Sequence, residues 1–507
     1  ITLYRNRKHL WGLLFVVLAL AVILAGCSGG SSGGSAGGSS GGSSGSAGGG
    51  GGSATGTATD PDDEIVSVSI MTPYYSETAP TAESEVVRET ERISKAKLDI
   101  RWVPQNTYEE ILNVTLASGD MPQVLMVMDP FHTAIINGIR SGMFWELDPY
   151  LDEFPNLNNF NEQVIQNTLI DGKRYIIPRP RPLVREGLIV RKDWLENVGM
   201  DLPTTIDEFY EMLVAFKEQD PDRNGVDDTY GYMLYEGLLD RDIFAWHGAP
   251  NRWKVENGEF IRDVETPEYM EGLKFYRKLY EEGLINPDFP IVARNEIRRD
   301  LYNNKVGASI EALDAVPPFY YFQMGETGNY FDLVVGGPIA GRVFSEPGHF
   351  GGAIIPKTSV KTEDELRQVL RYFDNQLSDE ATEEFTKLVT ENEQREPGEK
   401  FNIDDLKNLI VNDAAMYPPG DSELNQMIRQ RMEEHAQVSV PNPAEGLISA
   451  TEIEKGEQLK TILEDASIQF ILGDIDESGF YDAVERWKNA GGIQVKEELA
   501  ELYRQRN

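Results

Sequence analysis

An acidic segment between residues 220 and 228 has the residue types and spacing of a calcium-binding loop. Calcium in proteins takes six to eight oxygen ligands, and an EF-hand loop turns sharply at a glycine in its sixth position. Gly225 occupies that position. Oxygens for the ion stand at the first, third, fifth, seventh and ninth positions, namely Asp220, Asp222, Asn224, Val226 through its carbonyl, and Asp228. The spacing predicts a structural Ca²⁺ site.

The same loop departs from an EF-hand at its twelfth position, where a bidentate glutamate is expected. That position is Gly231. A solvated acidic turn that follows a helix is therefore the alternative interpretation.

Signals for catalysis are weak in this chain. The histidines after residue 27 are His132, His247, His349 and His435, and no two of them have the spacing of metal ligands. A formal G-x-S-x-G match at residues 33–37 lies in a Gly/Ser run, which provides neither the strand nor the helix that this nucleophile motif needs. A glycoside hydrolase needs only two carboxylates, so a secreted cell-surface hydrolase acting on oligosaccharides stays open as the alternative function.

The first 27 residues have the features of a secretory signal. A basic head precedes an apolar run from Leu10 to Ala25, which is shorter than the roughly 20 residues that a membrane-spanning helix needs. The run ends in Leu24-Ala-Gly-Cys27, which resembles the lipobox of bacterial lipoproteins. This resemblance implies cleavage before Cys27, lipidation of that residue (palmitate included), and a chain held at the outer face of the membrane. An uncleaved membrane helix is the alternative.

A linker and a strong negative charge follow from composition. Residues 28–59 are only Ser, Gly, Ala and Thr, so we expect a disordered linker over residues 28–61. The net charge is −37. Such a chain should be repelled by nucleic acid and by anionic lipid, which leaves the lipid anchor as its only membrane contact. The charge also disfavours polyanionic ligands such as uronic-acid polymers, unless the fold forms a local basic groove.

Strand and helix patterns alternate after the linker. Residues 64–70 alternate between apolar and polar, Leu98–Trp102 reads as a second strand, and Val124–Met128 is apolar throughout, as in a buried parallel strand. Helical patterns over 83–96 and 108–117 separate these strands. A capping box, Thr205 to Glu208, and a run from Pro267 to Glu282 begin further helices. The alternation predicts an α/β fold.

A set of short segments, each weak alone, occurs in a familiar order. The segments are Leu116–Leu125, Gly142–Pro149, Pro155–Leu157, Asp171–Pro178, Val190–Leu195, Pro203–Thr205, Tyr280–Leu284 and Trp487–Gly492. Taken together, the chain resembles the extracellular solute-binding proteins of carbohydrate ABC importers, especially the long lipoprotein type of Gram-positive bacteria. The resemblance covers nearly all of residues 62–507 but fails over 391–440.

The resemblance implies a two-lobed, periplasmic-binding-protein-like fold of type II with a hinge between the lobes. Residues 62–182 and 340–390 would form the first lobe, and 183–339 and 391–507 the second. A first crossing between the lobes would fall at Ile176–Ile189 and a return crossing at the glycine-rich segment Gly336–Phe350. Ordinary loops are the alternative at both places.

The same resemblance implies that the chain captures an oligosaccharide and passes it, unchanged, to the permease of an ABC transporter as a monomer. A sugar site needs aromatic platforms with polar groups at their edges. Tyr74, Tyr75 and Asp129 follow predicted strands, where α/β sheets place ligand-facing loops, and Arg185 lies in the first crossing. Trp246 and Glu311 are candidates by resemblance. A position in the core is the alternative for each aromatic residue.

Overall fold

The computed structural model describes residues 65–235, 241–317, 328 and 331–506. Contacts divide the chain into residues 1–58 and residues 59–507, and every described residue belongs to the second unit. The predicted signal segment with Cys27 and the predicted linker 28–61 lie outside the described residues. None of the helices in the described part is both long enough and apolar enough to cross a bilayer.

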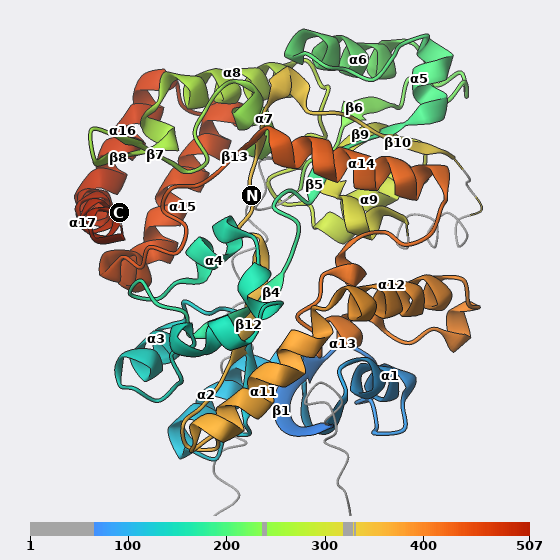
Figure 1. Cartoon of the computed structure of the whole chain (residues 1–507). Coiled ribbons are helices and arrows are strands. Elements are labelled where there is room, and N and C mark those ends of the chain that lie inside the picture. Colours follow the sequence, from blue (N-terminus) through green and yellow to red (C-terminus); the bar gives the residue numbers. More distant parts are fainter. Residues whose placement is uncertain (1–64, 236–240, 318–327, 329–330, 507) are drawn as a thin grey trace, which may run out of the picture. The chain divides into compact units, whose positions relative to one another are not determined.

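A five-stranded sheet forms the first part of the fold (Figure 1). Its strand order is β2-β1-β3-β12-β4, in which β1, β2 and β3 are parallel and β12 runs antiparallel to both β3 and β4. The strands are β1 (Val66–Tyr74), β2 (Ala96–Pro104), β3 (Val124–Val127), β4 (Ile176–Pro180) and β12 (His349–Ile354). The helices of this part are α1 (Glu85–Ile93), α2 (Tyr108–Ser118), α3 (Thr133–Arg140), α4 (Glu162–Thr168), α11 (Glu363–Gln376), α12 (Asp379–Glu393) and α13 (Ile403–Lys407).

The burial of the central strand β3 shows that both faces of this sheet are covered. Its four residues are all fully buried, as the uninterrupted apolar run predicted. Val124 and Met126 belong to one apolar cluster, whereas Leu125 and Val127 belong to another. Because successive side chains of a strand point to opposite faces, the two clusters lie on the two sides of the sheet.

A four-stranded sheet with the order β10-β5-β9-β6 forms the second part. Its strands are β5 (Glu186–Arg191), β6 (Tyr230–Tyr232), β9 (Val306–Ala312) and β10 (Leu333–Val335). The helices are α5 (Lys192–Val198), α6 (Ile206–Glu218), α7 (Arg241–Trp246), α8 (Pro267–Glu281), α9 (Arg294–Tyr302), α14 (Glu423–Gln437), α15 (Ala450–Leu472), α16 (Glu477–Trp487) and α17 (Ile493–Arg506). Two small ladders pair β7 (Trp253–Glu256) with β8 (Glu259–Arg262), and β11 (Val343–Phe344) with β13 (Ser439–Val440).

Helix α6 shows how local sequence fixes an element of the second part. The Thr205 hydroxyl accepts a hydrogen bond from the Glu208 N–H at 3.2 Å, and the Glu208 carboxylate accepts one from the Thr205 N–H at 3.1 Å. This confirms the predicted capping box. The apolar side of the helix is completely buried in the core of the second sheet and consists of Phe209, Met212, Leu213 and Phe216.

Two connections between the sheets coincide with the predicted crossings. The first crossing runs from β4 in one sheet to β5 in the other, and the return crossing runs from the end of β10 to β12. The predicted segments therefore do pass from sheet to sheet. Whether they act as hinges stays a prediction.

The segment from residue 391 to Met416 packs differently from the division drawn from sequence. That division placed 391–507 wholly with the second lobe, but Leu406, Leu409 and Met416 are buried in the core of the first sheet. The Thr72 hydroxyl at the end of β1 donates to the Asn408 carbonyl at 2.7 Å. Tyr417 packs against the cores of both sheets, and Leu424 is the next residue of the chain buried in that of the second, so residues 417–423 form a third connection. A helical pattern alone does not say which sheet a helix covers.

Candidate functional site

Strand ends from both sheets converge on the first crossing. The parallel strands β1 and β3 end at Tyr74 and Val127, and β4, which runs in their direction, ends at Pro180. Only a few residues later the chain enters β5, whose first residue Glu186 pairs with Ala312 at the end of β9. The crossing thus lies at the carboxyl ends of strands of both sheets, the edge at which α/β sheets place their ligands.

Three arginines lie along this crossing, and they differ in their partners. Arg185 is paired with Asp314, which follows β9, through two hydrogen bonds of 2.8 and 3.1 Å. Arg179 is almost fully buried and donates only to neutral acceptors: the Phe350 carbonyl at 3.0 Å, the Lys407 carbonyl at 3.3 Å, the Met128 sulfur at 3.8 Å, and the side-chain oxygen of Asn408. No carboxylate of the described residues pairs with Arg179.

Arg181 is the least satisfied of the three. Within the described part of the chain its side chain makes no ion pair, and its Nε–H is buried without a hydrogen-bond partner. Burial lowers the pKa of this guanidinium, and the neighbouring positive charge of Arg185 lowers it further. Buried donors are almost always paired in folded proteins, so an orphaned guanidinium at a strand edge needs an explanation.

The aromatic ring of Phe350 lies under two of these arginines. The guanidinium carbons of Arg179 and Arg181 stand 4.7 and 4.3 Å from the centre of the ring. The residue is nevertheless 37 % exposed. Its position depends on the bulge in β12 between His349 and Gly352, where Gly351 has a φ of +69° and a Cβ would collide with the Val127 carbonyl. Only glycine permits this approach.

Tyr75 is the second exposed aromatic residue at this edge. It is 39 % exposed, and its N–H donates to Asp405 on α13 at 2.6 Å. Burial raises the pKa of its hydroxyl, and the positive charges of Arg179 and Arg181 oppose that rise. The hydroxyl is therefore within electrostatic reach of both guanidinium groups. Tyr75 thus stands where the sequence predicted a platform, beside two arginines that the sequence analysis did not select.

Glu346, an acidic residue of the return crossing, lies within electrostatic reach of Arg181 and Arg185. Burial raises its pKa to about 7, although the charges of Arg185 and Arg181 oppose the rise. No ion pair joins Glu346 to Arg181 in the described chain. At neutral pH this carboxyl is therefore only partly charged, and it neutralises the arginines incompletely.

Tyr74 and Asp129 lie at the same edge of the first sheet, the edge at the carboxyl ends of β1 and β3. Tyr74 ends β1 and is half-buried. Asp129 is exposed after β3, and its carboxylate accepts a hydrogen bond from the Phe131 N–H at 2.9 Å. That bond fixes the turn before α3.

The ring of His349 lies edge-on to that of Phe131, with 6.5 Å between the ring centres. Burial lowers the pKa of His349 to about 4, so its imidazole is neutral.

Two candidates from the second part are placed inside the protein rather than at the crossing. The Trp246 ring is 5 % exposed and packs edge-on against Phe209 at 5.0 Å, within the main apolar cluster of the second sheet. Glu311 is 1 % exposed and is held by Arg298 through bonds of 3.0 and 2.5 Å. Both side chains have the surroundings of core residues, because their faces and oxygens are already occupied.

The structure brings the predicted calcium ligands together only in part. The Asn224 amide nitrogen donates to Asp222 at 2.8 Å and to Asp228 at 3.2 Å, while both oxygens of Asp220 accept backbone N–H groups of the loop. Burial raises the pKa of Asp222, and the neighbouring carboxylates of Asp220 and Asp228 add to the rise. Among the described residues no group of three or more Asp, Glu, His or Cys side chains is gathered closely enough to hold a metal.

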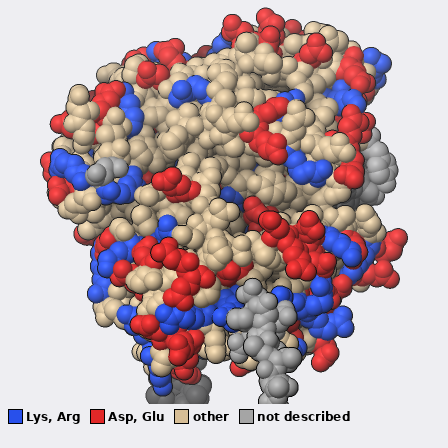
Figure 2. Space-filling model, viewed as in Figure 1, with Lys and Arg blue, Asp and Glu red and all other residues tan. Residues whose placement is uncertain are grey.

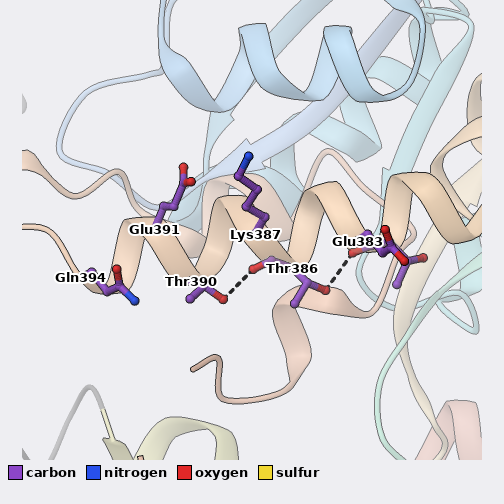
Figure 3. A pocket seen from close by; sticks show the side chains of 7 residues that line it. Glu383, Thr386, Lys387, Thr390, Glu391 and Gln394 are labelled. Carbon is purple, nitrogen blue, oxygen red and sulfur yellow. Dashed lines mark hydrogen bonds between the residues drawn. The ribbon is translucent and has the colours of Figure 1, made fainter. Parts of the chain in front are cut away.

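Two hollows of the surface lie outside the first crossing. One of about 530 Å³ is lined by a single face of α12, where Thr386 and Thr390 each donate to the carbonyl one turn back (Figure 3). Another, of about 450 Å³, is bordered by residues such as Trp253 and Arg342. The α12 hollow has no aromatic side chain in its lining. In the view of Figure 2, uncharged residues cover much of the upper middle of the molecule, and charged residues gather at its margins and over its lower half.

Sequence reasoning missed Arg179, Arg181 and Phe350. A signal for the arginines was present, because Arg179, Arg181 and Arg185 all fall in the predicted first crossing. Phe350 ends the predicted return crossing. Their convergence depends on the antiparallel pairing of β12 with β4, which the sequence does not reveal.

Comparison with known proteins gives consistent matches over most of the chain. Residues 76–396 match the family described as bacterial extracellular solute-binding proteins. The lipoprotein LipO of Bacillus subtilis is 36 % identical over 86 % of this chain and 92 % of its own length. The polygalacturonan/rhamnogalacturonan-binding protein YtcQ of the same organism is 35 % identical, over 87 % and 92 %.

Solved structures with the same fold are more distant in sequence. An HMO-binding, ABC-transporter associated solute-binding protein from Bifidobacterium longum infantis has a TM-score of 0.63 at 15 % identity, covering 87 % of this chain and 99 % of that one. An EF-hand mutant of the substrate-binding protein FusA from Streptococcus pneumoniae, in complex with fructo-nystose, has a TM-score of 0.56 at 18 % identity, with the same coverage. These likenesses confirm the predicted two-lobed α/β fold of type II.

Proposed function

Since the chain belongs to the bacterial extracellular solute-binding proteins, we propose that it captures an oligosaccharide outside the cell and delivers it to the permease of an ABC importer. The observation that carries this proposal is the pair of exposed aromatic rings, Tyr75 and Phe350, beside guanidinium groups at the strand ends. Sugars present apolar CH faces ringed by hydroxyl groups, and such a site offers both kinds of contact. Relatives are named as binding proteins for sugars rather than as enzymes.

Binding would use the rings as platforms and the polar groups at their edges for orientation. Tyr75 comes from the first sheet, whereas Arg185 and Asp314 border the second. A ligand that touches both sets would draw the two sheets together about the connecting segments. We propose the first crossing, the return crossing and residues 417–423 as the hinge, because a few connecting residues suffice to absorb such a rotation.

The N-terminal segment supports a proposal about location. A lipidated Cys27 and the Gly/Ser segment after it would hold the protein, as a monomer, at the outer face of the membrane. The relative LipO is named a lipoprotein, which agrees with an anchor of this kind. The anchor would be the only contact with the membrane, and the acidic chain would have no nucleic-acid partner.

The acidic loop supports calcium as a structural ion. Asp220, Asp222, Asn224, Val226 and Asp228 have the order of calcium ligands, and the structural neighbour FusA was solved as an EF-hand mutant. Another neighbour, the alginate-binding protein AlgQ2, was solved without calcium ion. A bound cation would offset the repulsion between Asp220, Asp222 and Asp228, and its function in this loop would be to stabilise the turn.

The test of the proposed function is a glycan screen. Thermal melting of the purified full-length chain would be followed with neutral and acidic oligosaccharides, because a ligand that binds only the folded state raises the melting temperature. Calorimetry would then measure the affinity, and chromatography would examine the glycan after incubation. Saturable binding of an intact glycan supports the proposal. Release of new reducing ends, or no response to any glycan, would overturn it.

A further inference from the structure

The positive charge at the first crossing lacks a partner in the described chain. Arg179 contacts only neutral acceptors, and Arg181 has a buried Nε–H with none. Both guanidinium groups lie against the same ring, that of Phe350. Burial lowers the pKa of Arg179 to about 10, and the charge of Arg181 contributes to this. Two like charges side by side in a half-buried site are costly unless an anion joins them.

Asp404, Asp314 and Glu346 lie within electrostatic reach of one or both guanidinium groups, but within the described chain none of them forms an ion pair with either. Asp314 is engaged by Arg185. Asp405 accepts the Tyr75 N–H. Glu346, whose pKa burial raises to about 7, carries only part of a charge at neutral pH. Two other arginines of the interior show the contrast: Arg298 is paired with Glu311, and Arg191 with Asp193 at 2.6 Å.

We propose that Arg181, supported by Arg179, binds a carboxylate of the glycan, so that the ligand is an oligosaccharide containing uronic acid. The inference rests on the proposed function and names its substrate class. A guanidinium presents parallel N–H groups that match the two oxygens of a carboxylate, and the fork is planar enough to stack on an aromatic ring at the same time. Phe350 holds Arg181 in that stacked position, and the exposed ring of Tyr75 is placed to accept a sugar face.

This local chemistry outweighs the charge of the whole chain. The net charge of −37 disfavoured acidic ligands in the sequence analysis. Charges at the surface act over about 8–10 Å in physiological salt, so distant carboxylates are largely screened at the crossing. Arg179 and Arg181 act at contact distance and in a partly buried setting, where charge–charge interactions are stronger than in water.

The experiment compares each acidic glycan with its own methyl ester. Esterification removes the charge but keeps the sugar rings and linkages. The probes are trigalacturonate, trimannuronate and triglucuronate with their methyl esters, together with the neutral glycans kestose, raffinose and galactotriose. Calorimetry on the full-length protein should give at least one acid that binds about 10- to 100-fold more tightly than its ester, as expected of a charge-assisted hydrogen bond.

Variants assign this preference to a side chain. Arg181→Gln should reduce the acid-to-ester preference to within about threefold, and Arg181→Lys, which keeps the charge but not the fork, should retain part of it. Arg140→Gln is the matched control, because it removes the same charge from an exposed arginine that pairs with Asp171. The control should preserve the full preference, and melting curves of all three variants would verify folding.

Each outcome separates the inference from the proposed function. If neutral glycans or esters bind as tightly as the acids, or if Arg181→Gln keeps the preference, the carboxylate site is wrong while capture of a glycan still holds. If none of the acidic, esterified or neutral glycans binds, the proposed function is itself overturned.

Discussion

Trp246 and Phe350 are aromatic residues in two regions with opposite surroundings. The Trp246 ring is 5 % exposed and is packed on Phe209, in a core that leaves it no free face. The Phe350 ring is 37 % exposed and lies against two guanidinium groups that form no ion pair with a carboxylate of the described chain. The difference shows that residue type alone does not identify a sugar platform. A platform needs an open face and polar neighbours whose bonding capacity is unused.

The largest expected effect lies in the interior. Trp246→Ala should lower the free energy of unfolding by about 3–5 kcal/mol, because it removes a buried ring and leaves a cavity beside Phe209. Glycan affinity of the folded variant should stay within about threefold. Denaturant titration and calorimetry measure the two quantities. A variant of nearly normal stability that fails to bind glycan would reverse the comparison and make Trp246 the platform.

Asp242 lies on α7, the helix that also holds Trp246. Burial raises the pKa of its carboxyl group to about 7. Glu186 and Glu346 add to the rise, while Arg241 and the Phe344 N–H oppose it. The folded protein keeps a proton that the unfolded chain releases near pH 4. Stability should therefore fall as the pH rises from about 4 to 7.

Asp242→Asn should remove this part of the pH dependence. The difference in unfolding free energy between pH 5 and pH 8 should shrink by on the order of 3 kcal/mol, because each pKa unit corresponds to about 1.4 kcal/mol. Urea titrations at the two pH values measure it. Asp201→Asn, which changes an exposed carboxyl, is the control and should leave the pH profile as it was. An unchanged profile for Asp242→Asn would mean that the buried group is charged.

At the crossing the expected effect is on binding rather than on folding. Phe350→Ala should weaken glycan binding about 10- to 30-fold, equivalent to about 1.4–2 kcal/mol, since it removes a platform and frees Arg181 to move. The unfolding free energy should change by less than about 1 kcal/mol, as for an exposed side chain. Phe350→Tyr keeps the ring and should bind nearly as well as the unchanged protein. Equal binding by Phe350→Ala would deny the ring any function in recognition.

Much of the fold follows from local patterns. Strand β3 was predicted because the apolar run Val124–Met128 suits a strand covered on both faces, and α6 because its capping box and apolar spacing agree. Residues 391–416 were assigned to the wrong sheet, because the amphipathic pattern of a helix fixes which side is buried but not its partner. The hydrogen bond from Thr72 to Asn408, which ties this segment to β1, joins residues 336 positions apart.

The candidate site was predicted less well than the fold. Tyr75 was selected because it follows a strand, and a strand end is visible in the sequence; its contact with a ligand stays a prediction. Arg181 was missed because its significance lies in an absence of partners, which depends on the position of every neighbour. Trp246 was selected by resemblance, and its burial arises from packing against Phe209, a residue on another helix.

The smallest expected effect concerns the acidic loop, the counterpart of the basic crossing. There the Asn224 amide bridges Asp222 and Asp228, so the polar groups already satisfy one another in part. A calcium site of extracellular strength has a Kd of about 10⁻⁴–10⁻³ M. At about 2 mM calcium the ion would raise the free energy of unfolding by about 1 kcal/mol. For a lobe of about 150–250 residues this corresponds to a rise of about 2–4 °C in Tm.

Chelation should therefore lower the Tm of the unchanged protein by a few degrees, and Asp222→Ala should abolish that response. Asp227→Ala is a matched control, because Asp227 lies in the same loop but outside the predicted ligand positions, and it should preserve the response. Glycan affinity should change little in either variant, because the loop follows α6 and not a strand end at the crossing. If millimolar calcium leaves the melting curve of the chelated protein unmoved, the hydrogen bonds of Asn224 suffice and the loop is a solvated turn.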